Sequence, residues 1–232
     1  MPTTNLRKRS LTKPRAKFIP KSEFAQQIIS KLEELYPVAN SELVFDGPYQ
    51  LIVSVVLSAQ CTDKKVNQVT PTLFAQFPDF CALAKAKLST IERIIRPINY
   101  YRTKARHLIE LAKEVQTKHS GKVPTDRNEL IALPGVGNKT ASVVQSELGV
   151  PALPVDTHIF RVANRLGLTE GKTPDQVSDD LRQIFPSEQW RGLHHRLIFL
   201  GRRICAARKP LCAQCVLSKV CRTGSELVNV ST

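Results

Sequence analysis

The chain carries the segment Leu133-Pro134-Gly135-Val136-Gly137-Asn138-Lys139-Thr140-Ala141, in which two glycines flank one apolar residue directly after a proline. Glycine accepts the positive φ angles and the close backbone approach that so tight a turn needs. Helical signals stand on both sides of the turn. We therefore expect a helix, a hairpin and a second helix in succession over residues 127–147.

The flanking signals give the two helices their ends. Asp126, with Glu129 three residues later, predicts the start of a helix over 127–132. Residues 139–147 form the second helical segment, which Gly149 is placed to end. Backbone N–H groups of the turn and the N-terminus of the second helix then point at one position, an arrangement that binds anions. In a basic protein we expect this anion to be a phosphate.

The whole chain is strongly basic. Of its 232 residues 34 are Lys or Arg and 20 are Asp or Glu, which gives a formal net charge of +14. Basic proteins of this size usually bind polyanions, so nucleic acid is the leading partner, although excess lysine can also serve solubility alone. The length and the hydrophobic content of 42% are enough for a folded core without disulfides.

The N-terminal segment concentrates part of this charge. Residues 1–21 contain Lys and Arg but no acidic residue, and the first acidic residue is Glu23. We interpret the segment as a disordered arm that binds nucleic acid, with an organellar transit peptide as the alternative. It has no secretory h-region, and no apolar run reaches the ~20 residues of a membrane span. We expect the cytoplasm and its nucleoid as the location in a bacterium, the nucleus or an organelle in a eukaryote, and a short tail over 226–232.

Helical signals run through the rest of the chain. Residues 22–36 carry one apolar face, and residues 48–59 are almost wholly apolar. The β-branched content of the second segment would also suit a buried strand, but its proline start and its length favour a central helix. Pro71 is expected to bend or divide the next helix, and residues 89–92 have the pattern of a capping box. No fixed-period repeat or convincing β-hairpin occurs in the sequence, so the predicted fold class is all-α.

Four of the six cysteines are crowded near the C-terminus with the spacing C-x6-C-x2-C-x5-C. They are Cys205, Cys212, Cys215 and Cys221. Thiolates this close together suit a metal centre better than disulfides. Structural zinc usually takes two short-spaced pairs and only one such pair is present, so the unequal spacing favours a [4Fe–4S] cluster over zinc. The other two cysteines, Cys61 and Cys81, are expected to be small core residues.

A lysine and a carboxylate stand where chemistry on a nucleotide would need them. Lys139 lies at the start of the second helix, whose positive end disfavours the ammonium form and so favours a nucleophilic amine. Asp156, in the segment Pro154-Val155-Asp156-Thr157-His158, could stabilise positive charge that develops on a sugar. The plainer alternatives are a surface lysine near phosphate and an N-cap aspartate. His158 could orient Asp156, contact DNA, or simply begin the next helix.

These motifs together resemble the endonuclease III family of DNA repair glycosylases. The segment 133–141, the segment Pro-Val-Asp-Thr-His-Ile-Phe-Arg-Val at 154–162, and the cysteine spacing with Ala-Arg-Lys-Pro at 207–210 all agree with the family pattern. The resemblance implies a bifunctional glycosylase and AP lyase that removes oxidised pyrimidines of the thymine-glycol type from double-stranded DNA. Lys139 would form the Schiff base and Asp156 would be the catalytic carboxylate, in a monomer that holds a [4Fe–4S] cluster.

The family pattern also implies where DNA is contacted. Leu-Ser-Ala-Gln-Cys-Thr-Asp at 57–63 is similar to the family loop whose glutamine enters the stack left by a flipped nucleotide, and Gln60 takes this role. The family's second wedge is the leucine of Gly-Leu-Tyr-Asn-x-Lys-Ala, but this chain has Asn99-Tyr100-Tyr101-Arg102-Thr103-Lys104-Ala105, which makes Tyr100 the candidate. The Tyr-Tyr pair also resembles the related adenine glycosylases, so the lesion range stays open. The other expected DNA contacts are Gly135, Val136, Gly137, Thr140, Arg208 and Lys209. For the last two, a solvated loop tip is the alternative.

The resemblance covers about residues 24–221 and implies two helical domains beside a DNA-binding cleft. Residues 41–150 would form a six-helix barrel that includes the helix-hairpin-helix at 127–147. Residues 22–40, together with 151–225, would form the cluster domain. Two other functions compete with the first: a related glycosylase with another base preference, such as mismatched adenine or thymine, and a non-enzymatic sensor of DNA damage.

Overall fold

The computed structural model describes residues 21–224, and every regular element in this range is helical. The predicted all-α fold class is therefore confirmed. The predicted basic arm, apart from Lys21, and the tail over 226–232 lie outside the described residues. Among the helices described, none combines the length and the apolar character that crossing a membrane requires.

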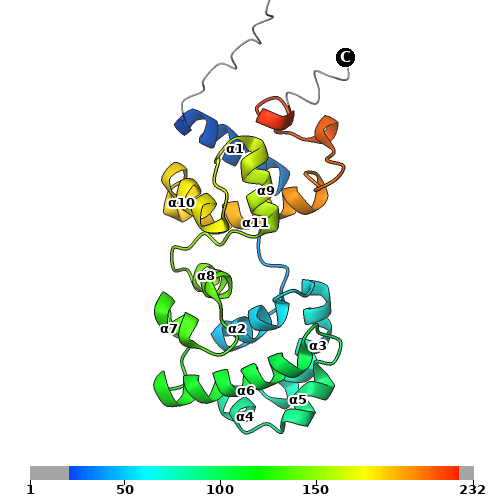
Figure 1. Ribbon diagram of the computed structural model, residues 1–232, viewed down its shortest axis with the longest axis vertical. Helices are drawn as coiled ribbons and strands as arrows, with labels where there is room; N and C mark the ends of the chain where they lie inside the picture. Colours follow the sequence, from blue (N-terminus) through cyan, green and yellow to red (C-terminus); the bar gives the residue numbers. More distant parts are fainter. Residues whose placement is uncertain (1–20, 225–232) are drawn as a thin grey trace, which may run out of the picture.

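The helices form two groups along the long axis of the molecule. In chain order they are α1 (Lys21–Leu35), α2 (Gly47–Ser58), α3 (Asp63–Gln76), α4 (Phe80–Ala84), α5 (Leu88–Ile94), α6 (Tyr101–Lys118), α7 (Arg127–Ala132), α8 (Asn138–Glu147), α9 (Thr157–Leu166), α10 (Pro174–Ile184) and α11 (Trp190–Arg203), with the 3-10 turns η1 (Ser187–Gln189) and η2 (Cys212–Gln214). Helices α1, α9, α10 and α11 lie at one end, and α2 to α8 lie at the other (Figure 1).

Helix α2 is the centre of the larger group. Its residues from Leu51 to Leu57 are all buried, and α3, α6 and α8 pack against it. A segment that is apolar on every side is stable only where it is covered all round, and Pro48 in its first turn starts it as a helix. The prediction of a buried helix over these residues is confirmed. One hydrophobic cluster accordingly extends from Leu43 to Val144.

Helix α3 differs from the prediction for Pro71. The sequence predicts a bend or a division at this proline, but α3 is one continuous helix with Pro71 inside it. Pro71 is exposed, whereas Val66, Val69 and Leu73 are buried in the core. A proline on the outer face removes one backbone hydrogen bond, and burial of the opposite face keeps the helix in one piece.

Helix α5 differs from the prediction for its start. Residues 89–92 have the pattern of a capping box, but the helix begins at Leu88, and its N-cap, Lys87, makes no side-chain capping bond. The carbonyl oxygen of Lys87 already accepts the N–H groups of Thr90 at 2.9 Å and Ile91 at 3.3 Å. The first turn is therefore closed before Ser89, and the predicted capping box is wrong.

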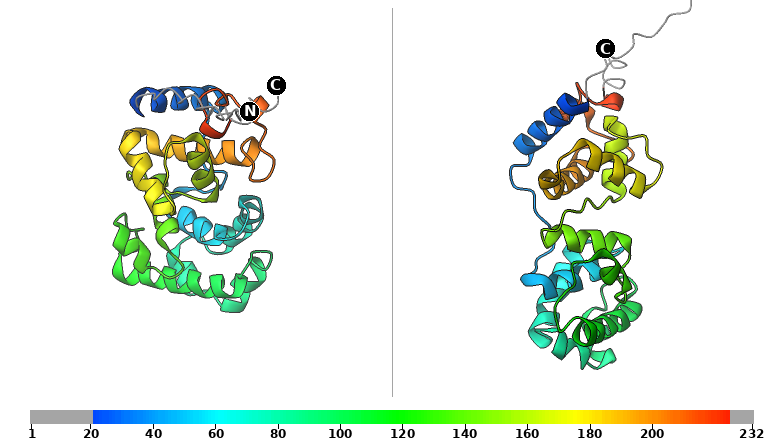
Figure 2. Two further views of the ribbon diagram at one scale, coloured as in Figure 1. Left: turned by 45° about the horizontal axis from the view of Figure 1, so that its top comes forward. Right: turned by 90° about the vertical axis from the view of Figure 1, so that its left-hand side faces the viewer.

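Helix α1 joins the C-terminal helices although α2 to α8 all lie between them in the sequence. Ile28 and Leu32 of α1 are fully buried, and the helix packs against α10 and α11. Figure 2 shows α1 beside these helices from two further directions. Helices α1, α9, α10 and α11, together with Leu217 beyond α11, form a second hydrophobic cluster.

A buried carboxylate connects the two groups of helices. Glu147, at the end of α8, has a side chain only 2% exposed, and its two oxygens bind His195 Nε2 at 2.7 Å and Arg191 Nη2 at 2.9 Å. Both partners belong to α11. Burial alone would raise the pKa of Glu147, but the hydrogen bonds and charges of His195 and Arg191 outweigh it and lower the pKa. Helix α8 is thereby fixed to α11 across the junction.

Candidate functional site

A cleft of about 1010 Å³ opens where the two groups of helices meet. It is lined by the N-terminus of α8, the segment 151–155, the start of α9 and part of α10. Lys139 and Asp156 are both among its lining residues. The two members of the predicted catalytic pair therefore open on one cavity, each carried by a different group of helices.

Lys139 is the second residue of α8, and its side chain is exposed. The N-cap of this helix is Gly137, which has no side chain to accept a bond, so the first N–H groups of α8 have no side-chain acceptor. Asn138 also lines the cleft, so this end of the helix opens on it. An uncapped helix N-terminus offers donors and partial positive charge to an anion.

The two glycines of the hairpin, Gly135 and Gly137, differ in backbone conformation and in the space around them. Gly135 has a φ of +80°, and a Cβ atom there would approach the side chain of His107 to 3.1 Å. Gly137 has a φ of −94°, and a Cβ atom there would have no neighbour within 4 Å. The positive φ angle predicted for this turn is therefore found at Gly135 and not at Gly137. Between them Val136 is buried in the core, and Thr140 is half-buried on α8.

Asp156 is the N-cap of α9. Its Oδ1 accepts the backbone N–H groups of His158 at 2.9 Å and Ile159 at 2.8 Å. The same carboxylate lines the cleft, and within the described chain its Oδ2 has no hydrogen-bond partner. One oxygen therefore fixes the side chain, while the other is available to a ligand.

The segment that carries Asp156 is held from α11. Residues Ala152, Leu153 and Val155 are buried, and the ring of His194 contacts the carbonyl oxygen of Pro154 at 2.9 Å through Nδ1. A carbonyl oxygen only accepts, so Nδ1 must carry the proton. Burial lowers the pKa of His194 to about 4, and the neighbouring His195 contributes in the same direction. The neutral ring thus acts as a fixed donor two residues before Asp156.

His158 lies in the first turn of α9, half-buried, beside Arg161. Its Nδ1 is 3.2 Å from Arg161 Nη2, and the same guanidinium donates to Gly201 O at 2.9 Å. The backbone N–H of His158, and not its ring, binds the carboxylate of Asp156. The ring therefore connects α9 to α11 through Arg161.

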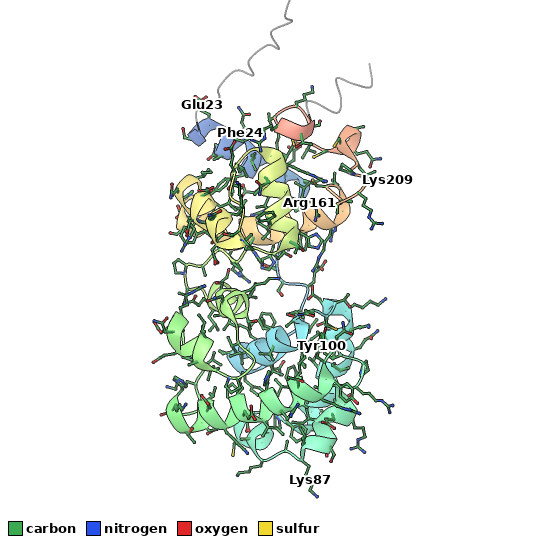
Figure 3. All side chains as sticks on the ribbon, viewed as in Figure 1. Glu23, Phe24, Lys87, Tyr100, Arg161 and Lys209 are labelled. Carbon is green, nitrogen blue, oxygen red and sulfur yellow. The ribbon has the colours of Figure 1, made fainter. Side chains whose placement is uncertain are left out.

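Gln60 and Tyr100 lie outside the lining of this cleft, in two turns that touch each other. Both side chains are exposed, and Tyr100 is 68% exposed. The side chain of Asn99 donates to the carbonyl oxygen of Gln60 at 2.7 Å. Figure 3 labels Tyr100 in the α2–α8 half of the molecule, below the junction between the two groups. The structure thus brings the two predicted wedge residues together.

The four clustered cysteines line one pocket beside α9 and α11. Two of the sulfurs accept hydrogen bonds: Arg165 Nη1 lies 3.4 Å from Cys205 Sγ, and the N–H of Gly224 lies 3.3 Å from Cys221 Sγ. Burial raises the pKa of the Cys215 and Cys221 thiols, and the neighbouring sulfurs add to this effect. Among residues 21–224, no three His, Cys, Asp or Glu side chains are grouped so that they could hold a single metal ion.

The remaining predicted residues are two basic residues and two cysteines. Arg208 and Lys209 are exposed on the loop between the first two clustered cysteines, and Figure 3 labels Lys209 at the edge of the α1–α11 group. Cys61 is half-buried against the larger core, as expected, but Cys81 is exposed. The prediction that Cys81 is a core residue is wrong, because it lies on the outer face of the short helix α4.

Several residues around these sites were not predicted from the sequence. Phe160, Lys172 and Arg182 line the cleft with Lys139, and no local motif marks any of them. Lys104 is buried at 6% exposure and binds the end of α2. A signal for Lys104 was present, because it shares one helical face with apolar residues such as Leu108 of α6.

The amino-acid sequence is similar to those of known DNA repair proteins. The HhH-GPD superfamily of base excision DNA repair proteins matches residues 53–187. Endonuclease III of Bacillus subtilis is 44% identical over 203 residues, which cover 85% of this chain and 91% of the relative. Endonuclease III of Escherichia coli K12 is 40% identical over 196 residues, which cover 84% of this chain and 93% of the relative.

Solved structures give the same result. A trapped covalent intermediate of an endonuclease III with DNA superposes with a TM-score of 0.84 at 41% identity, covering 91% of this chain and all of that one. A thermostable thymine-DNA glycosylase superposes with a TM-score of 0.79 at 25% identity, covering 88% of this chain and 98% of that one. On fold, on length of match and on identity, the chain belongs to the endonuclease III family within the HhH-GPD superfamily of base excision DNA repair proteins.

Proposed function

We propose that this protein excises damaged bases from double-stranded DNA and cleaves the abasic site that results, with Lys139 as nucleophile and Asp156 as catalytic carboxylate. The observation that carries the proposal is the opening of both side chains on one cleft, beside a helix N-terminus that lacks a cap. The relatives named endonuclease III, one of them trapped covalently on DNA, support it. Oxidised pyrimidines of the thymine-glycol type are the proposed substrates.

The chemistry assigns one task to each group. The Nζ lone pair of Lys139 attacks C1′ of the sugar, and the bond between C1′ and the base breaks, so that the base leaves with the bonding pair and takes up a proton. The free oxygen of Asp156 faces the positive charge that develops on the sugar. Ring opening then gives a Schiff base between Nζ and C1′. Loss of a C2′ proton expels the 3′ phosphate by β-elimination, and water releases the lysine.

DNA binding follows from charge and from the open hairpin. The net charge of +14 supplies a nonspecific attraction to phosphates. We propose that the N–H groups beside Gly137, with Gly135, Val136 and Thr140 shaping the turn, hold one phosphate at the N-terminus of α8. His158, Arg208 and Lys209 are proposed as further contacts, and Gln60 and Tyr100 as the residues that fill the gap left by a flipped nucleotide. The protein is proposed to act as a monomer.

We propose that the pocket lined by Cys205, Cys212, Cys215 and Cys221 holds a [4Fe–4S] cluster. The donor set fits this group, since four thiols surround one pocket and two of the sulfurs already accept hydrogen bonds of the kind that tune such clusters. A bound cluster would shape the loop that carries Arg208 and Lys209. We further propose that the two hydrophobic clusters correspond to a barrel domain over 41–150 and a cluster domain over 22–40 and 151–225.

Borohydride trapping tests the nucleophile. Wild-type protein should form a covalent complex with duplex DNA that contains an abasic site or thymine glycol, and Lys139→Ala should form none. Lys172 lines the same cleft, so Lys172→Ala is the informative comparison, and Lys118→Ala, an exposed position on α6, is the control. Trapping that persists in Lys139→Ala but disappears in Lys172→Ala would transfer the role to Lys172. A wild type that traps on neither substrate would refute the lyase proposal.

The second candidate function is a related glycosylase with a different base preference. The turn that carries Tyr100 gives a reason to test it. Tyr100 stands where the family pattern has leucine, and a thymine-DNA glycosylase is among the structural relatives. Excision rates measured for a panel of lesions and mismatches, each against all four opposing bases, separate the two candidates. Thymine glycol as the fastest substrate supports the proposal above, and a mismatched adenine or thymine as the fastest replaces it.

A further inference from the structure

Gln60 and Tyr100 hold backbone conformations that side chains rarely adopt. Their φ angles are +55° and +58°, in the left-handed region that normally favours glycine. Cys61 N donates to Ser58 O at 3.0 Å, and Ala59 has φ −56° and ψ 116°, so Gln60 occupies the position of a type II turn where glycine is usual. Such strain persists only where the surroundings enforce it, and it is concentrated at functional sites.

Lys104 enforces the conformation of the first turn. Its Nζ donates to Leu57 O at 2.7 Å and to Ala59 O at 2.6 Å, and the residue is only 6% exposed. These carbonyls end α2, where no further helical N–H group is available to them. Burial lowers the pKa of Lys104, so holding this amine inside the protein has a cost that a surface lysine avoids. A cation at a helix C-terminus offsets part of that cost.

The second turn is connected to the first at two points. The backbone N–H of Lys104 donates to Tyr100 O at 3.0 Å, which closes the first turn of α6 directly after the strained tyrosine. The side chain of Asn99 donates to Gln60 O at 2.7 Å. The hydrogen bonds therefore form a closed ring that passes from one turn to the other and back through Lys104 and Asn99.

We infer that Lys104 and Asn99 form a positioning bridge that holds Gln60 and Tyr100 at a fixed separation, so that both side chains enter the gap left by a flipped nucleotide together. The inference rests on the function proposed above and adds the device that prepares the two residues for it. A pair fixed in advance avoids the ordering cost that two mobile side chains would meet on binding. Lys104 and Asn99 act through the two turns and touch no reacting atom.

The test compares substrates that do and do not need the gap to be filled. Asn99→Ala removes one bond of the ring at an exposed position, and Lys104→Met keeps the side-chain length without a donor. Asn67→Ala is the matched control, because Asn67 Nδ2 also donates to a backbone carbonyl oxygen, that of Glu42 at 2.8 Å, and its side chain bonds to neither Gln60 nor Tyr100. For each protein, kcat/KM is measured for excision from a duplex lesion and for cleavage at an abasic site in single-stranded DNA.

We expect Asn99→Ala to lower the ratio of duplex to single-strand activity about fivefold, the loss that one hydrogen bond of ordinary strength would give. Lys104→Met should lower the ratio further, and Asn67→Ala should leave it unchanged. An unchanged ratio in Asn99→Ala, or an equal loss on both substrates, overturns the inference. Asn99→Ala alone decides the question if Lys104→Met does not fold.

A second readout separates this inference from the proposed function. Inactivity of the wild type on both substrates would refute the lyase proposal, and the bridge is then tested by binding. The protein is mixed with a duplex that has 2-aminopurine opposite a stable abasic analogue, where entry of the wedge residues unstacks the probe and raises its fluorescence. Wild type and Asn67→Ala should give the same rise, and Asn99→Ala a smaller one. Equal fluorescence in all three overturns the bridge.

Discussion

His194 should make the stability of this protein depend on pH over a defined range. The ring is 4% exposed on α11, and burial lowers its pKa to about 4 from an ordinary value of 6.5. As the pH falls below 6.5, the unfolded chain takes up a proton at this position, while the folded chain stays neutral until about pH 4. Acid therefore favours the unfolded state across this range, and stability is lost as the pH falls.

The size of the effect follows from the two pKa values. One pKa unit corresponds to about 1.36 kcal/mol, so His194 should reduce the free energy of unfolding by about 3 kcal/mol between pH 7 and pH 4. That is a large share of the ~5–15 kcal/mol that stabilises an ordinary domain. The loss also has a local consequence, because Nδ1 of the ring holds the carbonyl oxygen of Pro154, two residues before Asp156.

The measurement is a comparison with a variant that does not titrate. In His194→Asn the side-chain amide can still donate to Pro154 O, and it stays neutral at every pH. Urea unfolding at pH 7, 6, 5 and 4 gives the free energy of unfolding of both proteins, and the variant should gain about 3 kcal/mol on the wild type across this series. His194→Gln, with a different reach, should show the same slope from a different starting value. A difference between wild type and variants that does not change with pH would refute the reasoning.

Three further substitutions separate charge, packing and strain. Asp156→Asn should cap α9 as well as aspartate does, so the thermal midpoint should stay unchanged while base excision falls about 100-fold or more; unaltered excision would remove the carboxylate from the mechanism. Glu147→Gln should lower the free energy of unfolding, measured by urea denaturation at pH 7, by about 1–3 kcal/mol, because the buried partner of His195 loses its charge; no loss would mean that the junction does not depend on this ion pair. Gln60→Gly should raise stability by about 0.5–1 kcal/mol, as glycine adopts the left-handed conformation freely, while duplex excision falls; a loss of stability would show that the turn is not strained.

Helix ends that depend on residues close together in the sequence could be predicted. The predicted N-cap Asp126 accepts two backbone N–H groups at the start of α7, and α8 spans nearly the range expected. Each depends on a few consecutive residues whose side chains reach only their own backbone.

Features set by packing were not predictable in the same way. Pro71 fits inside α3 because its outward face meets solvent while the opposite face is buried, and the sequence does not say which face will be covered. The burial of Lys104 requires the end of α2 to meet the start of α6, and 45 residues separate Lys104 from Ala59. Such a contact exists only once the core has assembled, so a lysine in the pattern of α6 gives no indication of its partner.

The hairpin glycines show how structure separates requirements that look alike in sequence. Gly135 would place a Cβ against His107 at a positive φ, so the fold itself demands glycine there. Gly137 has an ordinary φ and open space around its Cα, and it is the exposed N-cap of the helix that carries Lys139. Nothing inside the described chain occupies that space, and an N-cap serine or aspartate would stabilise α8 by only a few tenths of a kcal/mol. The open space at Gly137 and the uncapped N–H donors beside it support the phosphate site proposed for this end of α8.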